Sequence, residues 1–456
     1  MGDHAHYGHA TTSINNRRAG SWSCWLRAPL ITVEVPSTSA DTVDLRRRSR
    51  ERMKWALFLQ MLAAVWSLGH TQTVDTEETA VEEEHVDLFT TPTSKLAAAT
   101  SDFGYNLFRA LAAKDSASNL FLAPTSISEA LTQLSMGASE QAQRQLYRAL
   151  RYHNLLDPQL HNTLRDLLTA IKGPEKGLKT AARIYLSRRL RPKQDFFGVV
   201  ERQYGVRPQS LTGGAKDLKD INDWVKQQTG NTIARFLAKA LPRNAGVNLV
   251  GAGFFKGKWV TRFGQSDAME EFQLDGGATV RIPMMHQDNY PMKMGIDSDL
   301  DCTIGQIQMH DDVSMFVFLP NNLISNMSLL EESLTAEFVQ DLAMTLQPTQ
   351  VSLKMPALKV SYFKDLLPVL SDLGLSDWLA ETNLVGVSAQ PAKLTSVNHR
   401  VVMEIAPEGT QYPGSATTVS HLLFHVNRPF LYLVRDEISG ALLVMGRVLN
   451  PKDLRK

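Results

Sequence analysis

The chain has 456 residues, of which 43% are hydrophobic, and a formal net charge of +1. This length is enough to bury a large core in one big domain or two. The balanced charge gives no indication of nucleic-acid binding, and no run of about 18 or more apolar residues indicates a membrane span.

The first 69 residues differ in composition from the rest of the chain. Residues 1–52 are polar and contain a basic cluster made of Arg46, Arg47, Arg48, Arg50 and Arg52. Met53 then precedes an apolar run with the length of a signal-peptide core, ending in small residues suited to cleavage after Gly69. We interpret 53–69 as a signal peptide and 1–52 as a non-native or alternative-start extension. An unusually long basic n-region is the alternative, and either interpretation predicts a secreted protein.

Residues 70–92 form an acidic segment, with its carboxylates concentrated at Glu77, Glu78, Glu82, Glu83 and Glu84. Charge runs of this kind are typically flexible and solvated, although a specific binding motif is the alternative. Removal of the leader would also remove Cys24 and leave Cys302 alone. We therefore expect no internal disulfide, and a buried, inert Cys302 thiol with a dimerising thiol as the alternative.

The main domain, 93–454, is predicted to place most helices early and most strands late. Apolar spacing predicts a helix from Lys95 and further helices over 124–137, 141–150, 159–171 and 222–236. A strand is predicted over 181–186, and the pattern from 280 to 320 is mostly that of strands. This order is typical of an α+β fold.

Near the C-terminus, a polar loop lies between predicted strands. Residues 401–405 alternate apolar and polar, as in a half-buried strand, whereas 430–434 and 441–448 are continuous apolar runs. Between the two runs, 436–440 has the composition of a tight turn. The loop over 408–430 is small and polar, so we expect it to lie exposed between strands.

This arrangement resembles the serpin family. Residues 424–434, with Asn427, Arg428, Pro429 and Phe430 at their centre, fit the family signature, and Glu408 to Thr410 stand where serpins carry the proximal hinge of their reactive loop. The resemblance implies a fold of three β-sheets and about nine helices, with an exposed reactive loop near the C-terminus. In inhibitory members, the loop inserts as a new central strand of the main sheet after a protease cleaves it.

The hinge departs from the inhibitory pattern. It reads Glu408, Gly409, Thr410, Gln411, Tyr412 and Pro413, whereas inhibitors follow the threonine with glutamate and a run of small residues. Proline has no N–H for a strand ladder, and losing one buried bond costs about 1–3 kcal/mol. The departure predicts a non-inhibitory serpin. The alternative is an inhibitor of a serine protease that tolerates the proline.

Three further residues match a polar cluster that serpins bury where the main sheet opens. They are Ser126, Asn222 and His399. The alternative is that these are three unrelated polar residues. A buried polar cluster specifies structure without being catalytic.

The resemblance extends from about Asp87 to Leu454 to one serpin that signals and binds matrix. It implies a heparin-binding cluster of Arg188, Arg189, Arg191 and Lys193, since guanidinium groups pair well with sulfate. Lys172, Lys176 and Lys179 are candidates to widen the patch, and Pro192 is a departure that could re-aim its neighbours. A solvated basic loop is the alternative.

The same resemblance assigns collagen binding to Asp297, Asp299 and Asp341, whose carboxylates could pair with basic collagen residues; ordinary turn aspartates are the alternative. Asn326 begins a glycosylation sequon. The sequence contains no nucleophile elbow, paired metal-ligand motif or phosphate loop. We therefore expect no enzyme, metal site or cofactor.

The resemblance implies an extracellular, monomeric factor of the neurotrophic and anti-angiogenic type. Its expected partners are heparin or heparan sulfate, collagen and a cell-surface receptor, without nucleic acid. A hormone-carrying serpin remains open, because a sequence does not display a ligand pocket.

Overall fold

The computed structural model of the chain describes residues 89–454 apart from residues 156, 174, 243–245, 265–267, 323–326, 377–383 and 412–421. The predicted extension, the predicted signal peptide and nearly all of the acidic segment lie outside the described residues. The same holds for Asn326, Tyr412 and Pro413.

Nine α-helices lie within the described residues: α2 (Pro92–Lys114), α3 (Pro124–Ser135), α4 (Glu140–Ala149), α5 (Leu160–Ile171), α6 (Gln194–Tyr204), α7 (Ala215–Gln228), α8 (Met327–Ser333), α9 (Ala336–Thr345) and α10 (Leu367–Leu370). Helix α2 begins three residues before the predicted start at Lys95. Thr91 and Ser94 form a reciprocal capping box at its start, which satisfies backbone N–H groups that a helix terminus leaves unpaired.

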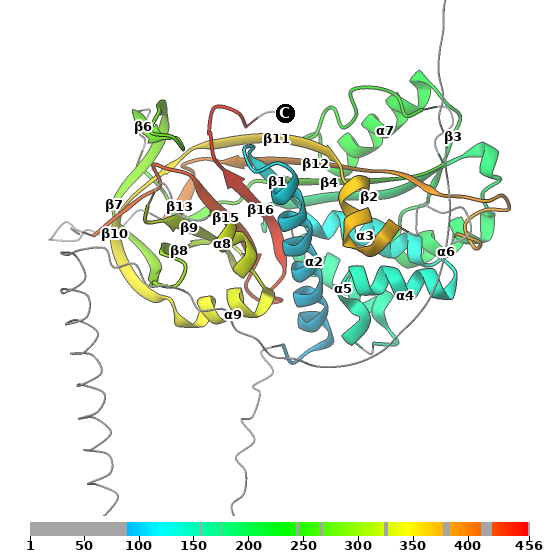
Figure 1. The fold of residues 1–456 in the computed structure, drawn as a ribbon, viewed down its shortest axis with the longest axis horizontal. Coiled ribbons are helices and arrows are strands. Elements are labelled where there is room, and N and C mark those ends of the chain that lie inside the picture. The colour runs from blue at the N-terminus through cyan, green and yellow to red at the C-terminus, as the bar shows by residue number, and fades with distance from the viewer. Residues whose placement is uncertain are drawn as a thin grey trace, which may run out of the picture. The chain divides into compact units, whose positions relative to one another are not determined.

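The described strands form two hydrogen-bonded sheets. The five-stranded sheet has the order β11 (Leu358–Asp365), β12 (Leu394–Ile405), β4 (Val247–Phe255), β2 (Leu178–Ser187) and β3 (Gln209–Leu211). In Figure 1 its long strands run across the view, with α3 on one side and α7 on the other. Contacts of α3 with β2 and β4, and of α7 with β2, agree with this layering.

The eleven-stranded sheet consists of β1 (Leu120–Leu122), β16 (Leu442–Val448), β15 (Phe430–Asp436), β9 (Val313–Pro320), β8 (Cys302–Met309), β7 (Thr279–Asp297), β10 (Gln347–Pro356), β14 (Leu423–His425), β13 (Gly409–Gln411), β5 (Trp259–Thr261) and β6 (Met269–Gln273). The 19-residue β7 pairs with β10, β8 and β6. Through these pairings β7 joins eleven strands into one sheet, so the described strands form two connected sheets where the prediction gave three. The predicted α+β class is confirmed.

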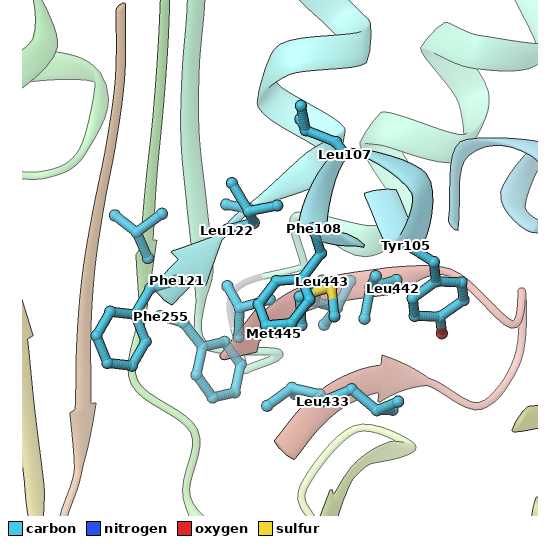
Figure 2. Close-up of a cluster of buried hydrophobic side chains, with 14 of the residues drawn as sticks. Tyr105, Leu107, Phe108, Phe121, Leu122, Phe255, Leu433, Leu442, Leu443 and Met445 are labelled. Carbon is cyan, nitrogen blue, oxygen red and sulfur yellow. The ribbon is translucent and has the colours of Figure 1, made fainter. Parts of the chain in front are cut away.

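Large apolar side chains fill the space between α2, the two sheets and α3. Figure 2 shows Phe108 of α2 close to Met445 of β16, with Phe121 and Phe255 nearby. All four are essentially inaccessible to solvent. A second, smaller cluster lies under α7 on the other face of the five-stranded sheet and includes Phe236. The sheet is therefore buried on both faces along β2 and β4.

Two predicted helix boundaries were wrong, for local reasons. The helix predicted over 222–236 ends at Gln228, because Gly230 and Asn231 adopt positive φ angles that end it. The segment from 327 to 345 forms two helices, α8 and α9, where its pattern had indicated one helix-like segment from Ser328 with Asp341 at its end; Thr335 caps α9 by accepting a hydrogen bond from the Phe338 N–H. Asp341 therefore lies within α9, about one turn before its end.

Candidate functional site

The seam between β4 and β12 runs through the centre of the five-stranded sheet. The two strands pair directly and in parallel, from Leu394 opposite Val247 to Met403 opposite Phe255. The sheet is therefore closed along the line between these strands. The backbone groups that β4 and β12 direct towards each other are paired along this register, so opening the seam would leave a row of them without partners.

His399 of β12 ties this seam to the helix beneath it. Its Nδ1 donates to the Gly251 carbonyl of β4 at 3.1 Å, and its Nε2 accepts a 3.1 Å bond from the Ala123 N–H at the start of α3. The ring is completely buried, and burial lowers the pKa of His399 to about 4. The neutral Nδ1–H tautomer satisfies both neighbours, whereas protonation would remove the acceptor at Nε2.

The structure brings two members of the predicted polar cluster together and separates the third. Ser126 donates to the Ala123 carbonyl at 3.0 Å, and Ala123 is the residue bonded to His399. Asn222 lies on α7 instead, where its side chain accepts from the Phe236 and Leu237 N–H groups and donates to the Leu237 carbonyl. Its inclusion in the cluster is therefore corrected. Asn222 fixes the loop after α7.

Three of the predicted hinge residues form a short strand on the eleven-stranded sheet. Residues Gly409–Gln411 make up β13, which pairs in parallel with β5. The Glu408 carbonyl accepts from the Trp259 N–H at 3.3 Å, and the Gln411 carbonyl accepts from the Arg262 N–H at 2.9 Å. The hinge therefore has hydrogen-bond partners outside the five-stranded sheet.

Close contact between the hinge and β5 requires glycine at position 409. A Cβ atom there would lie 2.6 Å from the Arg262 Cα and 2.9 Å from the Trp259 carbonyl oxygen. Two side chains add to the attachment: the Trp259 indole donates to the Ala406 carbonyl at 2.8 Å, and Thr410 Oγ1 lies 2.7 Å from His310 Nε2. The sequence alone did not predict that Trp259 holds the hinge.

The predicted basic cluster lies where β2 leads into α6. Arg188 and Arg189 occupy a 3-10 turn, Arg191 follows in a left-handed conformation, and Lys193 immediately precedes α6. All four side chains are exposed. The described residues include no acidic partner within ion-pair distance of the three arginines, whereas Lys193 Nζ donates to the Val385 carbonyl at 2.8 Å.

The three lysines considered as an extension of this cluster lie elsewhere. Lys179 is near the opposite end of β2 from Arg188, roughly 30 Å away at about 3.3 Å per strand residue. Lys172 pairs with Glu129 at 3.1 Å, and Lys176 pairs with the buried Asp436. The arginine cluster is therefore compact and is not widened by these lysines.

Two of the three predicted acidic residues face one surface hollow. Asp297, at the end of β7, and Asp341, on α9, line a hollow of about 400 Å³ whose walls include Ile304 and Leu342. Asp297 also accepts hydrogen bonds from the Asp299 and Leu300 N–H groups, which fixes its carboxylate in the turn. Asp299 is exposed and does not line the hollow.

Cys302 has the predicted buried environment. Its side chain is inaccessible to solvent, and burial, with smaller contributions from Asp297 and Asp301, raises the pKa of its thiol to about 12. A protonated, enclosed thiol is a poor nucleophile. Within the described part of the chain, no group of three His, Cys, Asp or Glu residues could hold a metal ion, and none of the described helices is long and apolar enough to cross a membrane.

Comparison with known proteins decides the family. Residues 98–451 match the family described as Serpin (serine protease inhibitor). The chain belongs to the serpin family. It is 38% identical over 377 residues to pigment epithelium-derived factor from Bos taurus, covering 81% of this chain and 90% of that protein. It is 32% identical over 393 residues to alpha-2-antiplasmin from Mus musculus, covering 84% and 76% of the two chains.

This serpin also shares its fold with solved structures. The crystal structure of mouse protein-Z dependent protease inhibitor aligns with a TM-score of 0.72 at 22% identity, covering 79% of this chain and 98% of the other. We interpret the five-stranded sheet as the main sheet that the resemblance implies, because its strand β12 ends at Ile405, three residues before the predicted hinge residue Glu408. The closed β4–β12 seam is the line along which an inserting loop would have to enter.

Proposed function

We propose that this protein is a secreted, non-inhibitory serpin that acts as an extracellular signalling factor and binds heparin-like glycosaminoglycan, collagen and a cell-surface receptor. The observation that carries the proposal is the hinge. Its described part is paired with β5 through Gly409 and Gln411, and the next two residues are Tyr412 and Pro413. Insertion would require β13 to leave β5 and a proline to enter a central ladder position, which its missing N–H opposes.

The rival function is inhibition of a serine protease. The family description and the name of alpha-2-antiplasmin favour it, whereas the similarity to pigment epithelium-derived factor and the bulky, proline-containing hinge sequence favour the non-inhibitory proposal. The two functions differ in a measurable product. An inhibitor forms a covalent complex with its protease that survives denaturation, and a non-inhibitor is only cleaved.

Matrix binding is supported by two surfaces of opposite charge. The arginine cluster is exposed and lacks acidic partners among the described residues, so several guanidinium forks remain available to sulfate groups. The hollow between Asp297 and Asp341 combines carboxylates with apolar walls. This combination suits a lysine or arginine side chain, whose aliphatic stem can contact the walls while its charge meets the rim. Opposite patches would let one molecule bridge both polymers.

A receptor-binding factor of this kind requires no catalytic residue, metal or cofactor of its own. We propose that it is glycosylated at Asn326 and extracellular, in line with the sequon and the leader-like segment 53–69. We propose a monomer, since the buried Cys302 is poorly placed to form a disulfide between two copies.

The test separates the two matrix surfaces. A variant carrying Asp297→Ala, Asp299→Ala and Asp341→Ala should lose retention on immobilised collagen and elute from heparin at unchanged salt. Asp275→Ala, which removes an exposed carboxylate in the turn after β6, is the matched control and should behave as wild type. Collagen affinity retained by the triple variant would refute the assignment of the acidic surface.

The reverse pattern should follow when the basic cluster is neutralised. Arg188→Ala with Arg189→Ala and Arg191→Ala should elute from heparin at lower salt, because fewer counterions are released on binding. Its collagen retention should not change. Lys226→Ala, an exposed lysine on α7, is the control for a general loss of positive charge, and an identical heparin elution position for cluster and control variants would contradict the proposal.

A further inference from the structure

A hollow of about 610 Å³ lies on the outer face of the five-stranded sheet, where α7 no longer covers it. Its walls are the loop after α7, the end of β4, and the strands β11 and β12. The loop contributes Ile233 and Arg235, and the strands contribute Lys359, Arg400 and Glu404. The hollow therefore lies beside the β4–β12 seam and extends from the loop across β12 to the edge strand β11.

The hollow contains more positive than negative charge. Three cationic side chains line it, Arg235, Lys359 and Arg400, against one carboxylate, Glu404. That carboxylate already pairs with Lys256 at 2.8 Å, although Lys359 lies directly across the ladder from it. No second acidic residue is among the described residues that form the walls. The excess positive charge thus has no further counterion among the described residues that form the walls.

Arg400 is the least exposed of these cations and the one held most firmly. Its Nε donates to the Phe236 carbonyl at 2.9 Å, its Nη1 donates to Ser361 Oγ at 3.1 Å, and the guanidinium lies over the Phe363 ring. A guanidinium has five N–H donors, and the remaining three have no hydrogen-bond partner among the described residues. Burial, and then repulsion from Arg235, lower the pKa of Arg400, so a bound anion would relieve an unfavourable environment.

We propose that this hollow binds a small oxyanion, a phosphate, sulfate or carboxylate group. The free edge of Arg400 would hold it by a two-point hydrogen bond, with Arg235 and Lys359 as flanking charges. A planar guanidinium suits two oxygen atoms of one anion, and such charge-assisted bonds are the strong ones. Apolar wall residues such as Ile233 and Val402 would contact the organic part of any ligand that carries the anionic group. This site is separate from the arginine cluster at the start of α6.

The site has a mechanical consequence for the sheet. The loop that carries Arg235 leads into β4, whereas Arg400 lies on β12. An anion held by both residues would therefore link the two sides of the seam. Because a ligand that binds only the closed form stabilises it, occupancy should slow hydrogen exchange of the β4 and β12 amides.

The experiment is a thermal titration with sodium phosphate at constant ionic strength, balanced with sodium chloride. The wild-type Tm should rise with phosphate to saturation. Arg235→Ala with Lys359→Ala, both exposed side chains, should raise the apparent Kd about tenfold or more, as expected for lost charge-assisted contacts. Lys226→Ala with Lys239→Ala removes two positive charges from α7 and the same loop without touching the hollow, and should respond as wild type.

Two further ligands identify the source of the anion, and a further variant serves as an independent check. Sodium sulfate tests the free ion, and a heparin disaccharide tests a sulfate group carried on a glycan; binding of either that weakens in the double variant supports the site. Arg400→Lys keeps the charge but loses the fork, and should also weaken binding. Because phosphate stabilises proteins generally by exclusion from their surfaces, an equal response from double variant and control would overturn the proposal.

Discussion

His399 should make the stability of this serpin depend on pH in one direction. The perturbation is His399→Gln, whose amide can donate to the Gly251 carbonyl and accept from the Ala123 N–H as the neutral ring does. The pKa of His399 is lowered by burial from 6.5 to about 4, a difference of 6.5 − 4, or about 2.5 units. Since a difference of one in pKa corresponds to about 1.4 kcal/mol, the full effect on the free energy of unfolding is roughly 3 kcal/mol.

The sign follows from proton uptake. Below about pH 6.5 the unfolded chain binds a proton at this histidine that the folded chain refuses, so stability falls as the pH falls towards 4. Between about pH 7.5 and pH 5 the wild type should lose roughly 2 kcal/mol relative to the glutamine variant. The assay measures the free energy of unfolding of both proteins from their first urea-unfolding transition across this pH range. Taking the difference between the two proteins cancels the contributions of all other titrating groups.

The control for this measurement is His153→Gln, which removes an exposed histidine. Its pH profile should follow the wild type. Parallel profiles for wild type and His399→Gln would refute the reasoning, since they would mean that His399 is protonated in the folded protein or is not enclosed between β4, β12 and α3.

Two substitutions and one measurement of thiol reactivity test separate parts of the structure. Gly409→Val should detach β13 from β5, because its Cβ would lie 2.6 Å from the Arg262 Cα; faster amide exchange at Arg262 would show it, and unchanged exchange would count against the hinge geometry. Lys176→Met should cost roughly 3–5 kcal/mol by leaving the buried Asp436 unpaired, as measured by urea unfolding, and a cost under about 1 kcal/mol would contradict a buried pair. Cys302 should react with a disulfide reagent at pH 8 only after unfolding, given a thiol pKa of about 12, so rapid reaction of the folded protein would disprove its burial.

Periodicity in the sequence predicted the elements whose pattern is set by one continuous buried face. The helix over 159–171 and the strands over 430–434 and 441–448 agree with α5, β15 and β16 within one or two residues. Within the helix predicted over 124–137, the apolar residues Leu131 and Leu134 are completely buried. In these segments the local pattern and the tertiary environment favour the same answer.

The contacts of the candidate sites join segments that lie far apart in the sequence, and the sequence of one chain does not reveal which of its segments meet. Asn222 was grouped with His399 by resemblance, yet helix α7 carries it to the outer face of the sheet, where it bonds Phe236 and Leu237. The attachment of Gly409 to Arg262 joins residues 147 positions apart. The separation of Lys179 from Arg188 follows from the length of β2, which the prediction placed over only part of its true range.

The most direct test of the proposed non-inhibitory function is the Tm of the purified protein before and after the loop is cleaved between Gly414 and Phe424. If the hinge stays on β5 and the β4–β12 seam stays closed, cleavage should leave the Tm nearly unchanged. A large rise in Tm would mean that the cleaved loop enters the main sheet despite Pro413, which would contradict the proposal and favour the inhibitory function.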